Sequence, residues 1–355
     1  MKYQTEIITQ IDASFAQQWK QLWKKAENAN VYNSYEWFAT CLETYKITDY
    51  ELYVCYKDGT LVALLPLQKY RIYGIPVCGI FCKDKAVETG FLIEKYDRTL
   101  FKHFFDSIIK KKNLYFQKID CKAAHLLHQL YPELFFSLMS VNPYISLTGD
   151  PFTNASATTI SRIQKVIKKN PDTLRFESYR TDLEKHLLTM FMLQENSSKK
   201  VRSMDIFAQE TTRNYYINLV KLCAKFIQIN FLYFGKVPIA YELGFIYRDR
   251  YLGDQISYHN EYKKYVPGKV LVYYMANELK KQKINVLDQG GGISSYKLSF
   301  TNTYHILYTM YYSHNPVIMF YWKLINEVRR LRQVAYPKKY TRDHEFLFKR
   351  LQDVK

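Results

Sequence analysis

The stretch VLDQGGGISSYKLSF, residues 286–300, places ionisable side chains around a run of three glycines. Asp288 precedes the glycines and ends a short apolar segment, and Tyr296 and Lys297 follow them. A carboxylate at the end of an interior strand usually faces a cleft, and glycines let a ligand approach the backbone closely. A carboxylate, a phenol and an ammonium group around such a backbone can perform acid–base chemistry. We therefore predict an active site here, with an ordinary flexible turn as the alternative.

Two familiar nucleotide-binding motifs do not fit this stretch. A Walker loop requires a glycine directly before its lysine, and no glycine precedes Lys297. A dinucleotide fingerprint requires G-x-G-x-x-G, whereas the three glycines here are consecutive.

A second candidate site lies upstream, in the stretch YKKYVPGKVL. Pro267, Gly268 and Lys269 are predicted to begin a helix directly after a strand, and proline suits the first helical turn. The unpaired amides and the dipole at a helix start favour a phosphate group, and Lys263 and Lys264 add positive charge. The alternative is an ordinary helix start with solvated lysines.

The elements that would position these residues follow from hydrophobic periodicity. We predict helices over 14–45, 99–112, 161–170, 181–195, 205–229, 268–283 and 317–335. We predict strands on both sides of the Lys57-Asp58-Gly59 turn, over 114–122, three more over 231–262, and further strands over 284–289 and 304–312. Both halves thus run helix, helix, β-meander, helix, strand, which indicates an α/β (α+β) protein with two similar domains.

The length of 355 residues also favours two domains. The stretch LTGDPFTNASATT, residues 147–159, is rich in turn-forming residues and supplies a boundary. We therefore predict domains over 1–150 and 151–335, followed by a basic polar tail over 336–355.

The positive charge is concentrated in the second half of the chain. Residues 1–150 hold 18 Lys and Arg against 16 Asp and Glu, whereas residues 151–355 hold 33 against 17. This asymmetry favours an anionic partner such as nucleic acid, anionic lipid or a phosphorylated small molecule, although a solvated lysine-rich surface would look the same. No apolar run is long enough for a membrane span, and no signal-peptide core begins the chain. The six cysteines are scattered, which fits free thiols in a reducing compartment. We therefore expect a cytoplasmic protein.

One group of residues in the first half raises the question of a metal. Cys121, His125 and His128 would share one face of a helix, and Cys78 or Cys82 could complete a zinc site. The neighbouring leucines favour an ordinary core helix instead, so we predict no metal.

The order of these motifs resembles the CelD/BcsL-type acyltransferases, which belong to the Fem-like branch of the GNAT superfamily. The resemblance rests on the IAYELGF strand, on EYKKYVPGKVL and its helix, and on D-x-G-G-G-x-x-x-Y-K-x-x-F, and it is best over residues 175–312. It implies two tandem GNAT-like domains, each with a mixed, mainly antiparallel sheet flanked by helices. It also implies that acetyl-CoA or another acyl-CoA binds the second domain in a cleft between separating strands, at Ser257, Tyr265, Val266, Pro267, Gly268 and Lys269. The usual GNAT phosphate signature is absent, since YVPGKV keeps one glycine.

The resemblance further implies direct attack of an acceptor amine on the acyl thioester. Asp288 would be the base and Tyr296 the proton donor to sulfur, with His259 and Glu242 as reserve bases, and backbone amides of residues 256–259 would polarise the thioester. Gln289, Gly290, Gly291 and Lys297 would contact the acceptor.

The acceptor that the resemblance implies is an amino sugar, a sugar nucleotide or another envelope-glycan precursor used in polysaccharide biosynthesis. Two rivals remain open. A Fem-like aminoacyl transferase would take its acyl group from charged tRNA, which the basic second half also suits. A non-enzymatic protein would bind RNA or a membrane surface through the basic C-terminal helix and tail.

Overall fold

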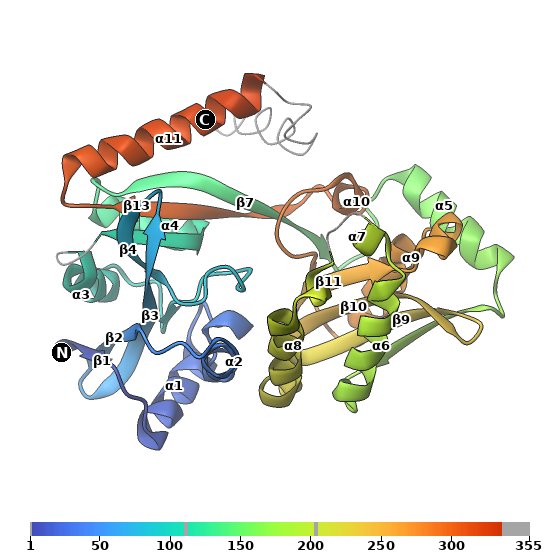
Figure 1. The fold of residues 1–355 in the computed structure, drawn as a ribbon, viewed down its shortest axis with the longest axis horizontal. Coiled ribbons are helices and arrows are strands. Elements are labelled where there is room, and N and C mark those ends of the chain that lie inside the picture. The colour runs from blue at the N-terminus through green and yellow to red at the C-terminus, as the bar shows by residue number, and fades with distance from the viewer. Residues whose placement is uncertain (1, 110–112, 202–204, 336–355) are drawn as a thin grey trace. The chain divides into compact units, whose positions relative to one another are not determined.

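The computed structural model describes residues 2–109, 113–201 and 205–335, and these fall into two compact units (Figure 1). Of the described residues, the first unit comprises 2–38, 47–109, 113–141 and 305–335, and the second comprises 39–46, 142–201 and 205–304. The expected division into 1–150 and 151–335 is therefore revised, because residues 305–335 belong to the first unit. The predicted tail, 336–355, lies outside the described residues.

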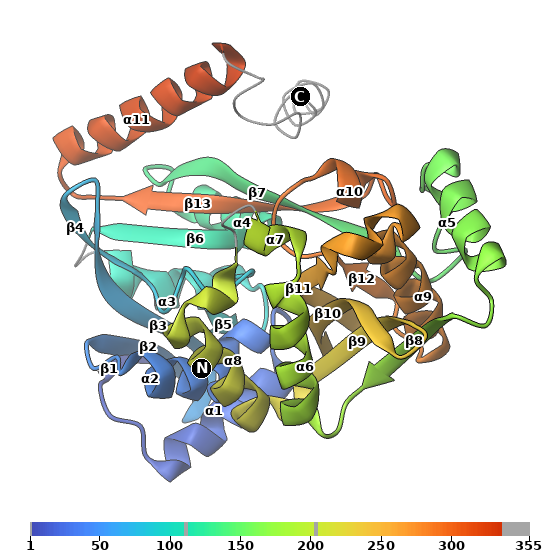
Figure 2. The same cartoon turned by 45° about the vertical axis from the view of Figure 1, so that its right-hand side comes forward.

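The first unit is built on a mixed sheet in the order β1-β2-β3-β4-β6-β13 (Figure 2). Pairing is antiparallel except between β4 and β6, which run parallel. The strands are β1 (Tyr3–Ile8), β2 (Tyr50–Lys57), β3 (Thr60–Ile72), β4 (Ile75–Ile80), β5 (Leu92–Ile93), β6 (Leu114–Asp120) and β13 (Tyr304–Tyr312), with β7 (Phe135–Ser146) continuing into the second unit. The helices are α1 (Ala13–Lys25), α2 (Tyr35–Tyr45, also shared), α3 (Arg98–Ile109), α4 (Cys121–Leu130) and α11 (Pro316–Ala335).

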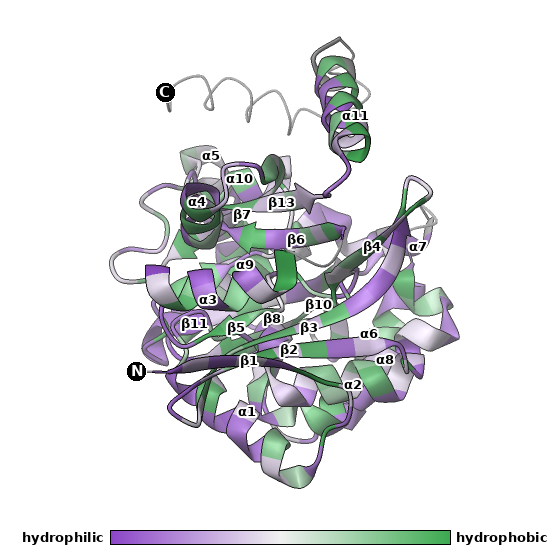
Figure 3. Cartoon of the chain, turned by 90° about the vertical axis from the view of Figure 1, so that its left-hand side faces the viewer, coloured by the Kyte–Doolittle hydropathy of each residue, from purple (hydrophilic) through white to green (hydrophobic). Residues whose placement is uncertain are grey.

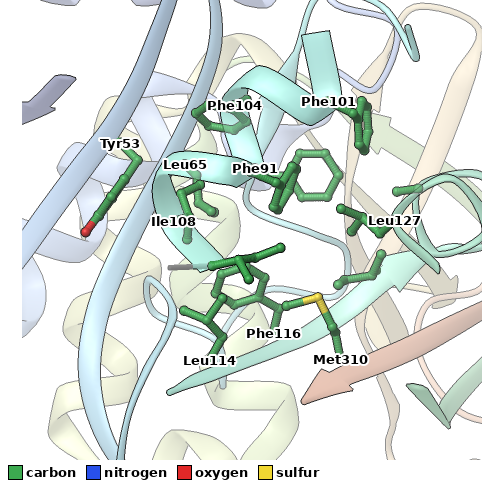
Figure 4. Close-up of a cluster of buried hydrophobic side chains, with 14 of the residues drawn as sticks. Tyr53, Leu65, Phe91, Phe101, Phe104, Ile108, Leu114, Phe116, Leu127 and Met310 are labelled. Atoms are coloured by element: carbon green, nitrogen blue, oxygen red, sulfur yellow. The ribbon is translucent and has the colours of Figure 1, made fainter. Parts of the chain in front are cut away.

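Amphipathic helices close the core of this unit. Helix α3 carries hydrophobic residues on one side and polar residues on the other, as the hydropathy colours of Figure 3 show. Its buried side includes Phe101, Phe104 and Ile108, which pack with Phe91 and Phe116 in a fully buried cluster (Figure 4). The 3.6-residue helical period brings these side chains onto one face, so burial of apolar area holds α3 on the sheet.

The second unit is built on a sheet in the order β7-β12-β11-β10-β9-β8. Its strands are β8 (Leu174–Tyr179), β9 (Ile227–Phe234), β10 (Val237–Tyr247), β11 (Arg250–Tyr258) and β12 (Val286–Asp288). Its helices are α5 (Ala157–Lys169), α6 (Leu183–Glu195), α7 (Ser198–Val201), α8 (Glu210–Leu222), α9 (Pro267–Lys281) and α10 (Ser295–Leu298). Strands β9, β10 and β11 form an antiparallel meander, and β12 returns parallel to β11.

Helices α6 and α9 cover opposite faces of this meander (Figure 2). Successive side chains of a strand point to opposite faces. Ala240 accordingly packs in the cluster that contains α9, while the hydroxyl of Tyr241 donates a hydrogen bond to Gln194 on α6 at 2.9 Å. Glu242, the next residue, therefore returns to the α9 face.

The predicted repeat of element order is confirmed: in each unit a meander leads through a helix to a parallel strand, α3 before β6 and α9 before β12. The helix predicted over 205–229 was partly wrong, because α8 ends at Leu222 and Ile227 already begins β9. Strands β1, β5, β7 and β8 were not predicted. Among the described helices, none combines the length and apolar character needed to cross a bilayer.

Candidate active site

The candidate site lies where β11 and β12 separate. The two strands pair over three positions only, Arg250 with Val286, Tyr251 with Leu287 and Leu252 with Asp288. Beyond these positions a cavity opens between them. Its walls are Gly253, Asp254, Gln255 and Ile256 from β11 and Asp288, Gln289, Tyr296 and Lys297 from the other side, with Glu242, Val272, Met275 and Leu287 completing the lining.

A β-bulge lies at this opening. Leu243 of β10 pairs with Gln255 and Gly244 pairs with Gly253, so Asp254 is an extra residue in β11. A bulge leaves its extra residue outside the ladder, bends the strand and increases its twist. Here the bulge disturbs β11 at the point where its pairing with β12 ends. Asp254 itself accepts a hydrogen bond from the hydroxyl of Tyr216 at 2.6 Å.

Glu242 is one of two buried carboxyl groups that line the cavity, with 4% of its surface exposed. Its Oε2 accepts hydrogen bonds from the side-chain amide of Asn230, at 3.1 Å, and from the hydroxyl of Tyr251. Burial raises the pKa of Glu242 to about 8, although these two hydrogen bonds lower it. A carboxyl group with a pKa near neutrality is well matched to proton transfer.

The second oxygen of Glu242 faces Gly253. A Cβ atom added to Gly253 would lie 3.0 Å from Oε1 of Glu242 and 3.3 Å from the carbonyl oxygen of Asp288. This glycine therefore keeps open the space between the carboxyl group and the gap between the strands. Asn230 and Tyr251 fix the carboxyl group through one oxygen and leave the other directed toward the cavity.

Tyr296 connects the two predicted sites. Its hydroxyl donates a hydrogen bond to the backbone carbonyl of Gly268 at 3.0 Å, so the phenol lies against the first turn of α9. Burial, followed by the nearby charge of Glu242, raises the pKa of Tyr296 far above its ordinary value. The phenol is therefore held as a neutral proton donor.

The three glycines form a tight loop with specific backbone requirements. Gly290 has φ +75°, and a Cβ atom there would lie 2.5 Å from the carbonyl oxygen of Gly253. Gly292 has φ +80°, and a Cβ atom added there would meet no atom within 4 Å. The first glycine is thus required by both conformation and close approach of β11, and the third by conformation alone.

Asp288 and Lys297 hold this loop. The Asp288 side chain is fully buried; its Oδ2 lies 2.5 Å from Nη2 of Arg250, and its Oδ1 accepts the Gly290 amide at 2.8 Å. The ammonium group of Lys297 donates to the carbonyls of all three glycines at 2.7–3.1 Å. Burial lowers the pKa of Lys297 to about 8, opposed by the charge of Asp288. The glycine carbonyls thus converge on one ammonium group.

The start of α9 has an open N-terminus. Val266, the N-cap residue, adopts left-handed angles (φ +46°, ψ +49°), and its side chain cannot accept a hydrogen bond from the first turn. Pro267 follows at the first helical position. Lys269 donates to Thr159 on α5 at 3.1 Å, and its pKa is lowered by burial and then by the charge of Arg162. Positive charge from α5, which the sequence prediction missed, therefore adds to this helix start.

The remaining predicted residues lie around these two features. Gln289 lines the cavity, and its amide nitrogen lies 3.4 Å from the backbone carbonyl of Lys297. Tyr265 packs against Phe234, and His259 packs edge-to-face against Tyr262. Within the described ranges, the buried Oγ of Ser257, Nδ1 of His259 and Oε1 of Gln289 have no hydrogen-bond partner.

The structure adds site residues that sequence reasoning missed. Residues that shape or orient the cavity but lie in strands with no motif around them are Asn230, Arg250, Tyr251, Gly253 and Asp254. The one usable signal in the sequence was a glycine inside each of two predicted strands, Gly244 and Gly253, because such a glycine often marks a bulge or a close approach. In the structure these two glycines pair with each other.

The Cys121 group is placed differently from a metal site. His125 lies 2.9 Å from Gln129, and the His128 ring packs edge-to-face against Phe136. These residues line an open cleft of the first unit, together with Tyr308 and Lys323. Over residues 2–109, 113–201 and 205–335, no three His, Cys, Asp or Glu residues are grouped to hold a metal ion.

The geometry of the second unit, a meander with a bulge, a splayed parallel strand pair and a helix starting at the opening, is that of an acyltransferase of the GNAT type. Residues 157–298 match the family model described as an acetyltransferase (GNAT) domain, and this range lies within the second unit. Residues 157–298 thus form a GNAT acyltransferase domain. A search of curated proteins returned no match.

Similar solved structures share the fold across both units. The crystal structure of FemX matches with a TM-score of 0.62 and 12% identity, covering 90% of this chain and 100% of that one. A conserved protein of unknown function from Bacteroides thetaiotaomicron VPI-5482 matches with a TM-score of 0.59 and 13% identity, covering 87% and 100%. The C-terminal domain of a putative lysylphosphatidylglycerol synthetase from Agrobacterium fabrum matches with a TM-score of 0.57 and 9% identity. This match covers 89% of this chain and 96% of that one. At these identities the likeness shows the fold alone.

Proposed function

We propose that this protein transfers an acyl group from acyl-CoA to an acceptor amine in the cavity between β11 and β12. The observation that carries the proposal is the early separation of these two strands, with the bulge of β11 and the buried Glu242 at the opening. An extended chain with amide groups, such as the pantetheine arm of CoA, can bind a free strand edge through backbone hydrogen bonds.

The start of α9 would bind the pyrophosphate of CoA. Its first-turn amides lack a side-chain cap, the helix dipole favours an anion, and Lys269 and Arg162 add positive charge. Tyr265, Val266, Pro267 and Gly268 would then surround the pyrophosphate, and Ser257 would lie beside the pantetheine arm. The unpartnered Oε1 of Gln289 would accept a hydrogen bond from the acceptor.

The chemistry requires three proton or charge events. Glu242, in its ionised form, takes a proton from the acceptor amine as the nitrogen attacks the thioester carbonyl. Backbone amides of the part of β11 that no longer pairs with β12, as expected from sequence for residues 256–259, stabilise the oxyanion of the tetrahedral intermediate. The carbon–sulfur bond then breaks, and Tyr296 gives its proton to the departing thiolate. The products are an amide and free CoA.

This assignment gives Asp288 a different role from the one expected from sequence. Both of its oxygens are engaged within the loop, by Arg250 and by the Gly290 amide. We propose that Asp288 and Lys297 fix the loop that forms one wall of the cavity. His259 stays a reserve base, since its ring lies at the end of β11 beyond the cavity lining.

The alternative donor is aminoacyl-tRNA, which the Fem-like resemblance implies and which the 33 Lys and Arg residues of 151–355 suit. The acceptor that the resemblance favours is an amino sugar, a sugar nucleotide or another envelope-glycan precursor. A single cleft could accept either donor, because each carries an activated acyl ester or thioester on a molecule with phosphate groups.

The deciding experiment compares donors directly. Melting temperature is measured with CoA, acetyl-CoA, longer acyl-CoAs and aminoacyl-tRNA, each at low and moderate salt. Under the proposal, CoA compounds at a hundred times their Kd stabilise the protein by about 3 kcal/mol, because they bind only the folded state. Stabilisation by aminoacyl-tRNA alone would favour the alternative donor.

The matched variants are Gly268→Asp and Gly268→Ala. A Cβ atom at this position would contact Tyr258 and Tyr296 at an ordinary 3.7 Å, so Gly268→Ala should fold and bind CoA. Gly268→Asp places a carboxylate at the helix start and should abolish CoA binding through repulsion of the pyrophosphate. Unchanged CoA binding by a folded Gly268→Asp would place the phosphate site elsewhere.

A further inference from the structure

Helix α11 of the first unit has two apolar sides, and only one of them is buried. The buried side carries Trp322, which is fully enclosed and packs with Val77, Tyr115 and Tyr311. Asn326, one turn further on, accepts a hydrogen bond from the hydroxyl of Tyr311 at 3.3 Å. These contacts hold α11 along the sheet of its own unit.

The other side of α11 is a stripe of large apolar residues exposed to solvent. The hydrophobic residues of α11 are the green parts of its ribbon in Figure 3. At 100° per residue this stripe lies opposite Trp322 and Asn326. Its members and their exposed fractions are Val317 (72%), Phe320 (66%), Tyr321 (41%), Leu324 (49%), Val328 (39%) and Leu331 (52%). Monomeric soluble proteins rarely expose so continuous an apolar stripe, so this one indicates an interaction surface.

Positive charge borders the stripe. Lys323 and Arg330 lie on one side of the helix, with the Lys323 ammonium 6.0 Å from the centre of the Phe135 ring, and Arg329 lies on the other side with its guanidinium over the Tyr73 ring. Glu327 is the single acidic residue of α11, and it pairs with Arg330. An apolar stripe with phenylalanine and leucine, bordered by basic side chains, is the pattern of a helix that lies in the interface of an anionic bilayer.

We propose that α11 binds the surface of an anionic membrane with this stripe, parallel to the membrane plane. The apolar side chains enter the boundary between headgroups and acyl chains, and the basic side chains contact lipid phosphates. Because Trp322 packs the opposite side of α11 against the sheet, membrane binding by α11 also brings the first unit to the membrane surface. The charge on the borders favours an anionic lipid over an apolar protein surface as the occupant.

The test is sedimentation of the full chain with phosphatidylcholine vesicles that contain 0 or about 30% phosphatidylglycerol. The expected result is binding to the anionic vesicles that weakens at high salt. Phe320→Ser/Leu324→Ser should reduce the partition coefficient roughly ten- to hundred-fold, because two large apolar side chains are lost from the buried stripe. Its melting temperature should stay unchanged, since both side chains are exposed.

The control is Leu188→Ser/Met192→Ser on α6, which removes two equally exposed apolar residues (60% and 61%) from the second unit. This control should bind vesicles like the wild type. Equal binding of wild type and Phe320→Ser/Leu324→Ser, or no binding of the wild type, would overturn the proposal. A wild-type dimer that becomes a monomer in Phe320→Ser/Leu324→Ser would instead assign the stripe to self-association, and loss of binding on addition of RNA would assign it to nucleic acid.

Discussion

Replacement of Glu242 by glutamine separates its stability effect from its catalytic effect. Glutamine has nearly the same shape and imitates the protonated carboxyl group, so the hydrogen bonds from Asn230 and Tyr251 can persist. The substitution removes only the ability to ionise. The consequences for folding and for catalysis then have different pH dependences.

The expected stability effect follows from the raised pKa. Glu242 titrates at about 8 in the folded protein against 4.5 for an ordinary glutamate. Between these values the folded protein keeps the proton and the unfolded chain has lost it, so the free energy of unfolding of the wild type falls by about 1.4 kcal/mol per pH unit. The total loss in the free energy of unfolding is roughly 5 kcal/mol. This loss is complete above pH 8 and absent below pH 4.5. Glu242→Gln does not undergo this loss.

The measurement is urea unfolding at pH 5, 6, 7 and 8 for the wild type, Glu242→Gln and the exposed control Glu43→Gln. Near pH 5 wild type and Glu242→Gln should have similar free energies of unfolding. By pH 8 Glu242→Gln should be the more stable by several kcal/mol, while Glu43→Gln follows the wild type. Turnover, measured as release of the CoA thiol, should rise with pH through about 8 in the wild type and fall roughly 100- to 10,000-fold in Glu242→Gln.

Two results would refute different parts of this reasoning. A difference between wild type and Glu242→Gln that does not change with pH would show that Glu242 is not held protonated in the folded protein. A Glu242→Gln variant that gains stability as expected but keeps its turnover would show that the base lies elsewhere, with the burial argument intact.

The glycine loop supplies the other predictions. Asp288→Asn should lower the free energy of unfolding by about 3 kcal/mol, because it removes the buried negative charge that pairs with Arg250, while turnover per folded molecule stays within about threefold. Loss of turnover with a normal melting temperature would restore Asp288 as the base. Gly290→Ala should cost about 3 kcal/mol, because a Cβ atom meets the carbonyl of Gly253 at 2.5 Å in addition to the φ of +75°. Gly292→Ala carries only the conformational cost and should lose about 1 kcal/mol, so equal melting temperatures for these two variants would contradict the close approach of β11.

The sequence predicted most elements of the fold because their hydrophobic periods are strong. The amphipathic face of α3 and the turn between β2 and β3 are local signals that need no knowledge of distant residues. The prediction missed that the chain returns to the first unit after residue 304, because this depends on pairing between distant segments. Strand β13 pairs with β6 almost two hundred residues away, and nothing in YHILYTMYY identifies its partner.

The candidate site was predicted in location but not in detail. Asp288, Tyr296 and Gly268 stood out through glycine and proline punctuation, and the structure brings Tyr296 to Gly268 at 3.0 Å. The orientation of Glu242 depends on Asn230, Tyr251 and the gap at Gly253, which lie on three strands. Such an arrangement is fixed by register between strands, and register between distant segments is not written in local spacing.

The return of β13 and α11 to the first unit sets an order on synthesis. A ribosome makes residues 142–304 of the second unit before it reaches Tyr304–Tyr312. Until then β6 has β4 on one side and an unpaired edge on the other, and the core lacks Met310 and Tyr312. An unpaired edge invites pairing with other chains, so a nascent chain or a fragment that ends near residue 150 should be prone to aggregate. The unit that begins first along the chain is thus the one that finishes folding last.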